Sequence, residues 1–174
     1  AFYFMAGVME HANEMCLITN PLVNSYKRLV PGYEAPIYIA WSATNRSPLI
    51  RIPAARGEGT RVELRCPDPS ANPYLALAVC LAAGLDGIRK QIMPPATVVK
   101  NVYEMRLDEK KAEGIEALPA TLSEAVDELE KDEYILEVLG EHISRNYIAA
   151  KRTEWAEYTS QVTDWEIEQY LYKI

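Results

Sequence analysis

Charged side chains alternate along one short segment of this 174-residue chain, and their order could bind a metal ion together with anions. Residues 60–65 predict a β-strand, in which side chains alternate between the two faces. Arg61, Glu63 and Arg65 therefore share one face, in a line roughly 13 Å long. A carboxylate is a preferred ligand of Mg²⁺, and arginine binds carboxylate or phosphate through paired hydrogen bonds. A solvated edge strand could carry the same charges, so both interpretations stand here.

Arginine is concentrated around this strand. Residues 24–65 contain seven basic and three acidic residues, a net charge of +4 in a chain whose overall charge is −7. Because arginine outnumbers lysine here, the segment favours a site for carboxylate or phosphate. Surface ion pairs with the acidic remainder of the chain would explain the charge pattern equally well.

The elements that must position these charges include three short strands. Apolar alternation predicts strands over 37–42 and 49–52, and Asn45–Pro48 predicts a turn between them. The third strand is 60–65, preceded by a glycine-rich connector. Together they predict a small sheet over about residues 36–65.

Helices are predicted on both sides of this sheet. Helical spacing of apolar residues predicts a helix over 2–18, and Pro21 is expected to open the next one. Asn72 is expected to cap a helix whose apolar stretch, 74–85, would be buried on most sides. After residue 95 the chain becomes acidic and helical. The expected helices there follow a capping box at Thr121–Glu124, lie between Asp132 and Gly140, cover 141–162, and follow a capping box at Thr163–Glu166.

Composition excludes several classes of protein. Apolar residues make up 49% of the chain and charged residues 25%, as in ordinary globular domains. The negative net charge disfavours a nucleic-acid partner, and the longest apolar run, 74–85, is too short to span a membrane. Three unpaired cysteines disfavour disulfides and fit a reduced, cytoplasmic protein. His11 and His142 are expected to be structural. Since the chain begins at Ala1, within an apolar stretch, we expect it to be part of a longer protein.

Several of these segments resemble a known family. The segments that carry the resemblance are Asn24–Pro36, Asn45–Pro53, Arg61–Tyr74 and Ala83–Ile88. In order and spacing they are similar to glutamine synthetase, and Leu118–Leu122 and Leu139–His142 look like the type I enzymes of the Gram-positive or clostridial kind. The resemblance covers all 174 residues but only about the last 40% of a family member.

The resemblance implies a fold and an activity. The fold would be α+β, with a few antiparallel strands of the catalytic half-barrel and a mostly helical C-terminal region. Residues 1–95 would form the active-site part and 96–174 the helical part. The parent enzyme would join glutamate and ammonia, using ATP and two Mg²⁺ or Mn²⁺ ions, through a γ-glutamyl phosphate.

The resemblance also assigns roles to single residues. Glu63 matches a metal-binding glutamate, and Glu34 matches the glutamate that binds ammonium and removes its proton. Arg28 and Arg65 match arginines that hold the glutamate substrate. The phosphate-binding and nucleotide-binding arginines match Arg46, Arg51 and, less closely, Arg61; Arg46 would also be catalytic.

The departures from the family pattern lead to two hypotheses. The N-terminal β-grasp domain, two earlier metal-ligand glutamates and a metal-binding histidine have no match here. We therefore expect a fragment that is inactive alone, from a parent that forms a homododecamer through a helix near 164–174. The alternative is a non-catalytic structural or regulatory module. Because such a module has no need to keep Glu34, Arg46 and Glu63 together, the enzyme hypothesis is favoured.

Overall fold

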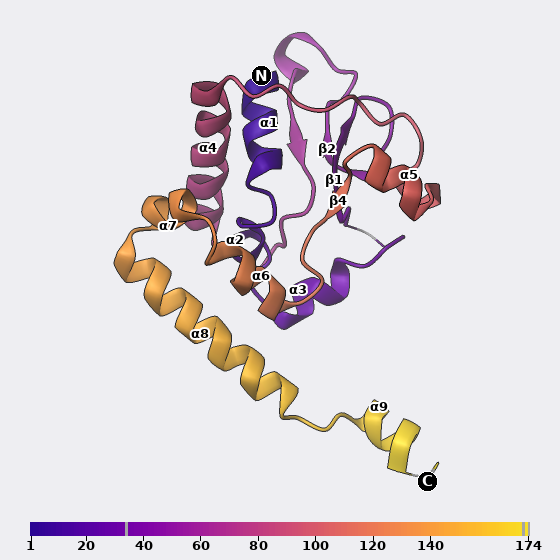
Figure 1. Ribbon diagram of the computed structural model, residues 1–174, viewed down its shortest axis with the longest axis vertical. Helices are drawn as coiled ribbons and strands as arrows, with labels where there is room; N and C mark the ends of the chain where they lie inside the picture. Colours follow the sequence, from indigo (N-terminus) through magenta and orange to yellow (C-terminus); the bar gives the residue numbers. More distant parts are fainter. Residues whose placement is uncertain (34, 172, 174) are drawn as a thin grey trace.

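The computed structural model of the chain describes residues 1–33, 35–171 and 173. These residues form an α+β fold in which helices pack beside a small sheet (Figure 1). In chain order the elements are α1 (Phe2–Glu10), α2 (Cys16–Thr19), α3 (Val23–Arg28), β1 (Tyr38–Ser42), β2 (Pro48–Arg51), η1 (Gly57–Gly59), β3 (Glu63–Leu64), α4 (Pro73–Lys90), η2 (Val102–Glu104), α5 (Leu107–Ala112), β4 (Glu116–Ala117), α6 (Leu122–Leu129), α7 (Glu133–Leu139), α8 (Glu141–Thr159), α9 (Asp164–Glu166) and η3 (Ile167–Leu171).

The sheet is mixed, with the strand order β3-β2-β1-β4. The outer strands run antiparallel to their neighbours, but β1 and β2 are parallel, which corrects the expectation of antiparallel strands. The reason lies at the end of β1. The Ser42 hydroxyl oxygen accepts hydrogen bonds from the N–H groups of Thr44 and Asn45, at 3.3 and 3.1 Å. Residues 43–47 then carry the chain back along β1, so that Pro48 lies opposite Tyr38.

Two strands differ in extent from the prediction. The strand expected over 60–65 is reduced to Glu63–Leu64. The strand β4, Glu116–Ala117, lies in the part expected to be helical and was not predicted. A two-residue strand has too few residues to show alternation, so the sequence pattern could not predict it. Its position is set by pairing with Tyr38 and Ile39 of β1.

Helices α1 and α4 lie side by side and touch through their backbones (Figure 1). A Cβ atom added at Gly7 would lie 2.1 Å from the Ala83 carbonyl oxygen, and one at Gly87 would lie 2.2 Å from the Tyr3 carbonyl oxygen. Both distances are far below van der Waals contact. Only glycine at these two positions permits the helices to approach so closely.

Helix boundaries differ from the prediction at three places. The helix expected over 2–18 ends at Glu10 and resumes at Cys16, because His11 leaves the helical path where its ring contacts two carboxylates. The following helix begins at Val23 rather than at Pro21. The long helix α8 ends at Thr159 rather than at residue 162.

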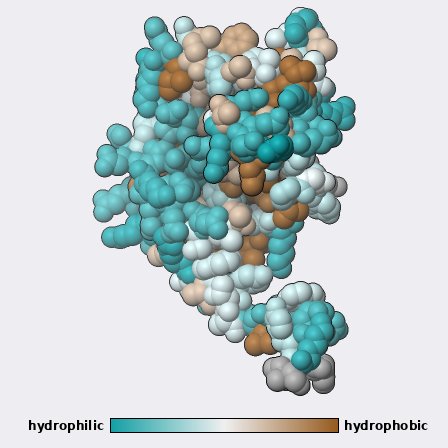
Figure 2. Space-filling view, turned by 45° about the vertical axis from the view of Figure 1, so that its right-hand side comes forward, coloured by the Kyte–Doolittle hydropathy of each residue, from teal (hydrophilic) through white to brown (hydrophobic). Residues whose placement is uncertain are grey.

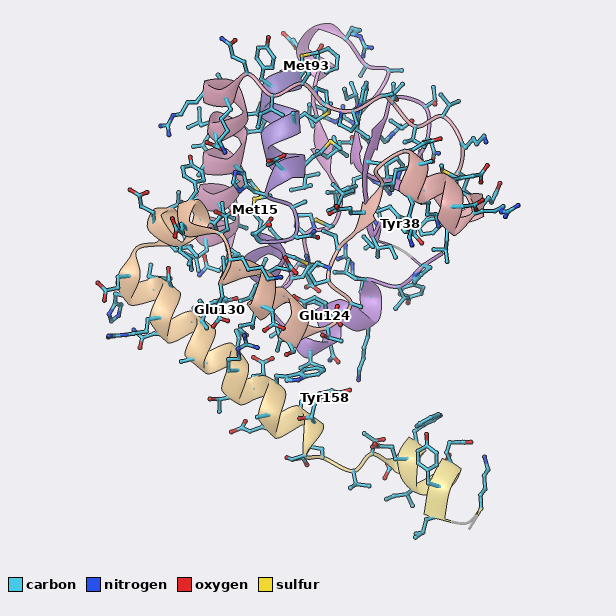
Figure 3. The ribbon with its side chains drawn as sticks, viewed as in Figure 1. Met15, Tyr38, Met93, Glu124, Glu130 and Tyr158 are labelled. Carbon is cyan, nitrogen blue, oxygen red and sulfur yellow. The ribbon has the colours of Figure 1, made fainter. Side chains whose placement is uncertain are left out.

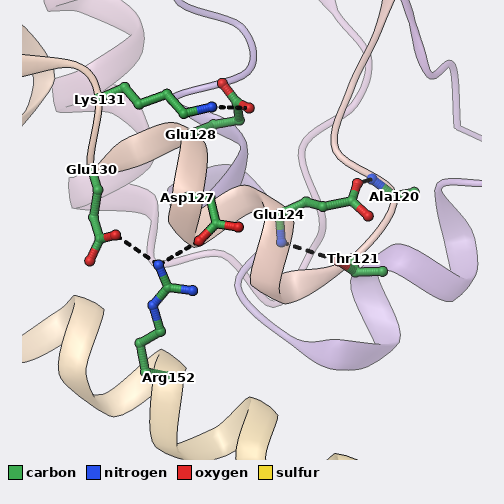
Figure 4. A network of polar contacts seen from close by, with 8 residues as sticks. All are labelled: Ala120, Thr121, Glu124, Asp127, Glu128, Glu130, Lys131 and Arg152. Carbon is green, nitrogen blue, oxygen red and sulfur yellow. Dashed lines mark hydrogen bonds and ion pairs between the residues drawn. The ribbon is translucent and has the colours of Figure 1, made fainter.

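The predicted caps in the C-terminal region are confirmed. The Thr121 hydroxyl accepts a hydrogen bond from the Glu124 N–H at 3.1 Å, and the Glu124 carboxylate accepts one from the Ala120 N–H at 2.8 Å (Figure 4). Asp132 caps α7, and Gly140 ends it. Arg152 of α8 binds Asp127 and Glu130 of the α6 region, at 2.5 and 2.7 Å, which ties α8 to α6 (Figure 4).

One face of α4 contradicts the expectation that 74–85 would be buried on most sides. Tyr74, Leu77 and Leu81 are 84%, 71% and 55% exposed. A groove of about 470 Å³ lies beside this face, between α1, α4 and β3. The expectation rested on apolar residues all around the helix. Among the described residues, α4 is packed chiefly on the side toward α1, α2 and α7.

The segment that follows α8 stands apart from the body of the molecule (Figure 2). It includes the capping box at Thr163–Glu166, which is confirmed, and exposes Trp165, Tyr170 and Leu171. Residues 172 and 174 of the expected terminal helix lie outside the described residues. Among the described helices, none combines the length and the hydropathy that crossing a membrane requires.

Candidate functional site

The pairing of β2 with β3 places Arg51 directly opposite Glu63. An Arg51 Nη1 to Glu63 Oε2 distance of 3.3 Å joins the two side chains. On the other side Arg61 donates to Glu63 Oε1 through Nε and Nη2, at 2.9 and 2.7 Å. Both oxygens of this carboxylate therefore face arginine.

These contacts keep Glu63 ionised. Hydrogen bonds from Arg61 are the largest cause of a lowered pKa at Glu63, and the positive charge of Arg51 acts in the same direction. Burial opposes the shift, although about a quarter of the side chain remains exposed. Glu63 therefore pairs with Arg61 of the predicted strand segment and with Arg51 of the neighbouring strand.

Arg46 and Arg65 lie together at a second, adjacent position. Arg65 Nη1 donates to the main-chain carbonyl of Arg46, and both residues line an open pocket of about 370 Å³. Burial lowers the pKa of Arg65, and the charges of Arg51 and Arg46 lower it further, whereas Glu63 raises it. The four side chains thus lie close enough to influence one another, and the pocket that Arg46 and Arg65 line can accept an anion.

A distant segment, residues 100–103, holds this pocket together, and no sequence pattern predicted its position. The Asn45 side chain donates to the Lys100 carbonyl at 2.5 Å, and the Val102 N–H donates to the Ser47 hydroxyl at 3.0 Å. Tyr103 also lines the pocket, and its hydroxyl donates to the Ala35 carbonyl at 3.4 Å. Asn and Ser flanking Arg46 were the available signal, since these types hydrogen-bond nearby backbone.

The segment is further braced through Tyr38. The rings of Tyr38 and Tyr103 lie 5.6 Å apart, and Lys110 of α5 donates to the Tyr38 hydroxyl at 2.9 Å. Figure 3 shows Tyr38 on the side of the sheet toward α5. Aromatic and polar contacts therefore join the sheet, η2 and α5 behind the pocket.

One of the predicted site residues, Arg28, makes its hydrogen bonds outside this cluster. Arg28 donates to the main-chain carbonyls of Cys66 and Pro67, at 2.8 and 3.3 Å, and so supports the chain just after β3. Its role in binding glutamate stays a prediction. Glu34 lies outside the described residues.

A metal centre is only partly represented. Among residues 1–33, 35–171 and 173, no three His, Cys, Asp or Glu side chains come together as metal ligands would. Glu63 has the right chemistry for Mg²⁺ or Mn²⁺, but it is a single carboxylate and both its oxygens are paired with arginine. The described residues therefore do not fit a complete metal site.

Comparison with known proteins agrees with this geometry. Residues 1–170 match the model of the catalytic domain of glutamine synthetase. The chain is 56% identical over 173 residues to a glutamine synthetase of Clostridium saccharobutylicum and 55% identical over 170 residues to that of Thermotoga maritima. These alignments cover 99% and 98% of this chain, and 39% of each relative.

Solved structures show the same fold. A structure described as "GmaS/ADP complex-Conformation 1" superposes with a TM-score of 0.84 at 40% identity, covering 98% of this chain and 39% of that one. A second, "Apo GmaS without ligand", gives a TM-score of 0.83 at 40% identity. The chain spans about two fifths of the length of these relatives. Its match to the family model across nearly all its residues, and the cluster of arginines around Glu63, place the chain in the glutamine synthetase family.

Proposed function

We propose that this chain supplies part of the active site of a glutamate–ammonia ligase, which makes glutamine from glutamate, ammonia and ATP through a γ-glutamyl phosphate. One observation carries the proposal: Arg46, Arg51 and Arg65 converge near Glu63 beside an open pocket. An acyl phosphate and its carboxylate precursor are both anions. Converging guanidinium groups bind such anions and offset charge that develops during phosphoryl transfer.

Each side chain has a proposed role. Arg46 and Arg51 bind the transferred phosphate, Arg61 contacts the nucleotide, and Arg65 binds the glutamate substrate together with Arg28. Glu34 accepts the proton of bound ammonium. The nucleotide role draws support from the structural relative described as an ADP complex.

Glu63 is proposed to contribute one ligand to Mg²⁺ or Mn²⁺, with further ligands that the described residues do not supply. When bound, the metal would neutralise phosphate charge. The chain's own contribution is to hold Glu63 ionised, through Arg61 and Arg51, whether or not a metal is present.

The chain is proposed to act within a larger catalytic domain, as its last portion. The apolar groove beside α4 and the short outer strand β3 would then pack against other strands of that domain. A homododecameric assembly, in which the exposed apolar side chains of 164–171 contact another subunit, belongs to the same proposal. Cytoplasmic localisation also belongs to it and is supported by the free cysteines.

The test uses two proteins. The first is the chain itself, assayed for ATP-dependent γ-glutamyl hydroxamate formation with Mg²⁺ or Mn²⁺. The second is a chimera, in which this chain replaces the matching segment of the Clostridium saccharobutylicum enzyme, to which it is 56% identical over 173 residues. We expect no turnover from the folded chain and turnover from the chimera.

A matched pair of variants tests the proposed role of Arg46 against that of a surface arginine. Arg46→Ala in the chimera removes a proposed phosphate ligand, whereas Arg152→Ala removes a surface arginine that binds Asp127 and Glu130. We expect turnover to fall about 100-fold or more in the first variant and little in the second. A folded chimera without turnover would overturn the proposal and favour a non-catalytic module.

A further inference from the structure

A buried histidine lies between two carboxylates, away from the arginine cluster. His11 follows α1 and is only 6% exposed. Its Nε2 lies 2.9 Å from Asp86 Oδ2 of α4, and its Nδ1 contacts Asp132 Oδ2 at the start of α7. One imidazole ring therefore joins three helices that are far apart in the sequence.

The chemistry of the ring fixes how many protons this arrangement needs. A carboxylate only accepts hydrogen bonds, and a neutral imidazole has one N–H donor and one acceptor nitrogen. A neutral His11 would leave one ring lone pair facing a carboxylate oxygen. The imidazolium, with two N–H groups, satisfies both Asp86 and Asp132.

Charge balance supports the same proton count. Lys90 Nζ lies 2.6 Å from Asp86 Oδ2 and adds a positive charge to the cluster. The cluster of His11, Asp86, Lys90 and Asp132 is therefore neutral when His11 is protonated. Without that proton the cluster would carry a net negative charge with both aspartates nearly buried, which is unfavourable.

The surroundings add charges of both signs. The titratable groups that face His11 from the elements packed around it are Glu10 of α1, Glu14 of the following loop, Asp86 and Lys90 of α4, Lys131 and Asp132 after α6, and Glu133 and Tyr134 of α7. Glu128 of α6 acts on Glu14 and pairs with Lys131. Acidic groups outnumber basic ones in this set, which again favours a protonated ring.

We propose that His11, in its protonated form, is a pH-sensitive clamp that fastens α1, α4 and α7, and that this junction loosens when the proton leaves. Asp132 makes the clamp sensitive for a second reason. Its Oδ1 accepts the Ile135 N–H at 3.0 Å and so caps α7, while its Oδ2 contacts His11. Losing the imidazolium thus disturbs the start of α7 as well as the contact with α1.

The direction of the pH effect follows from the pKa of His11. Hydrogen bonding to Asp132 is the largest cause that raises this pKa above 6.5, and it outweighs burial, which lowers it. A raised pKa in the folded state gives stability that is fully present below pH 6.5. That stability is lost as the pH rises through the folded-state value.

The first measurement needs no destabilising variant. The chain contains only two histidines, and His142 is exposed, so His142→Gln leaves a single imidazole signal in an NMR titration. We expect the His11 ring protons to titrate above pH 6.5 in the folded chain. Titration at or below pH 6.5 would overturn the proposal.

A matched pair of aspartate variants tests the contacts. Asp86→Asn removes one of the two carboxylates, whereas Asp127→Asn removes one that binds Arg152 on the surface of α6. We expect Asp86→Asn to lower the pKa of His11 and Asp127→Asn to leave it unchanged. Equal values in both variants would contradict the clamp.

Urea unfolding between pH 6.5 and 8.5 then measures the consequence. One extra bound proton in the folded state lowers the folding equilibrium constant by at most about tenfold for each pH unit. We expect this slope in the chain and in Glu14→Gln, a control for a nearby half-buried acid, but not in His11→Gln. An unchanged slope in His11→Gln would overturn the proposal.

Discussion

Arg51 and Glu63 face each other across the β2–β3 pair, with Arg51 Nη1 3.3 Å from Glu63 Oε2. The charge arrangement of the candidate site therefore depends on the register of two short strands. A slip of one residue would turn Glu63 to the opposite face of the sheet and leave Arg51 without this partner. The Arg51–Glu63 pair joins sheet geometry to site chemistry.

Replacing Glu63 tests this pair directly. Glu63→Gln keeps the shape but removes the charge that Arg51 and Arg61 hold in place. In the chimera we expect hydroxamate turnover to fall about 100-fold or more, since the proposed carboxylate ligand of Mg²⁺ or Mn²⁺ would be lost. The control is Glu130→Gln, which alters only the surface pair with Arg152. A turnover that stays within twofold of the parent chimera would exclude Glu63 from the site.

Replacing Arg28 distinguishes a structural role of this residue from a role in binding glutamate. Its two hydrogen bonds to the Cys66 and Pro67 carbonyls support the chain after β3. Because hydrogen bonds from a charged group contribute about 2 kcal/mol, Arg28→Met should lower the free energy of unfolding by about that amount. Urea unfolding measures this change, with Lys27→Met as the exposed neighbouring control. Unchanged stability, with a raised KM for glutamate in the chimera, would favour the ligand role alone.

Gly7 tests the close contact of α1 with α4. Gly7→Ala would force a methyl group against the backbone of Ala83 and Gly87, so the two helices must separate. We expect the free energy of unfolding to fall by about 3 kcal/mol. Ala150→Ser adds one atom at an exposed position of α8 and should change it by less than about 0.5 kcal/mol. Equal stability of the two variants would mean that the helices do not meet through their backbones.

The cysteines should differ in reactivity. Burial raises the pKa of Cys16 to about 12 and that of Cys80 to about 11, and burial also raises the pKa of Cys66. At pH 8 all three are protonated. Cys80 is half-buried and lines an open groove, whereas Cys16 and Cys66 are buried. Iodoacetamide at pH 8, followed by mass spectrometry, should modify Cys80 first and the other two only after urea is added. Early modification of Cys16 would contradict its burial.

Much of the helical structure could be predicted from local signals. Asn72 with Pro73, Thr121, Asp132 and Thr163 mark helix starts through side-chain caps, and each of these caps is present. A cap depends on residues within one helical turn, so the sequence alone is sufficient to identify it.

The sheet could not be predicted to the same degree, because pairing joins distant residues. The return of the chain over residues 43–47 depends on the Ser42 hydroxyl and on contacts with Lys100 and Val102. Alternation within one segment was enough to single out Arg61, Glu63 and Arg65 as candidate site residues. That Arg51 and Tyr103 lie beside them could be seen only in the folded structure, because they come from other parts of the chain.

The segment 43–47, which carries the chain back along β1, limits how far this region can be shortened or lengthened. Five residues, 43–47, must run back along β1, whose four steps span about 13 Å. Removing one residue would disrupt the hydrogen bonds of Ser42 and Asn45 that shape this return, and β2 would shift against β1, carrying Arg51 with it. Insertions should instead be tolerated at the turn Gly57–Gly59, which has no buried residue and lies between β2 and β3 but outside both strands. Length variation among natural or engineered versions of this region should therefore accumulate at residues 57–59 and be absent from residues 43–47.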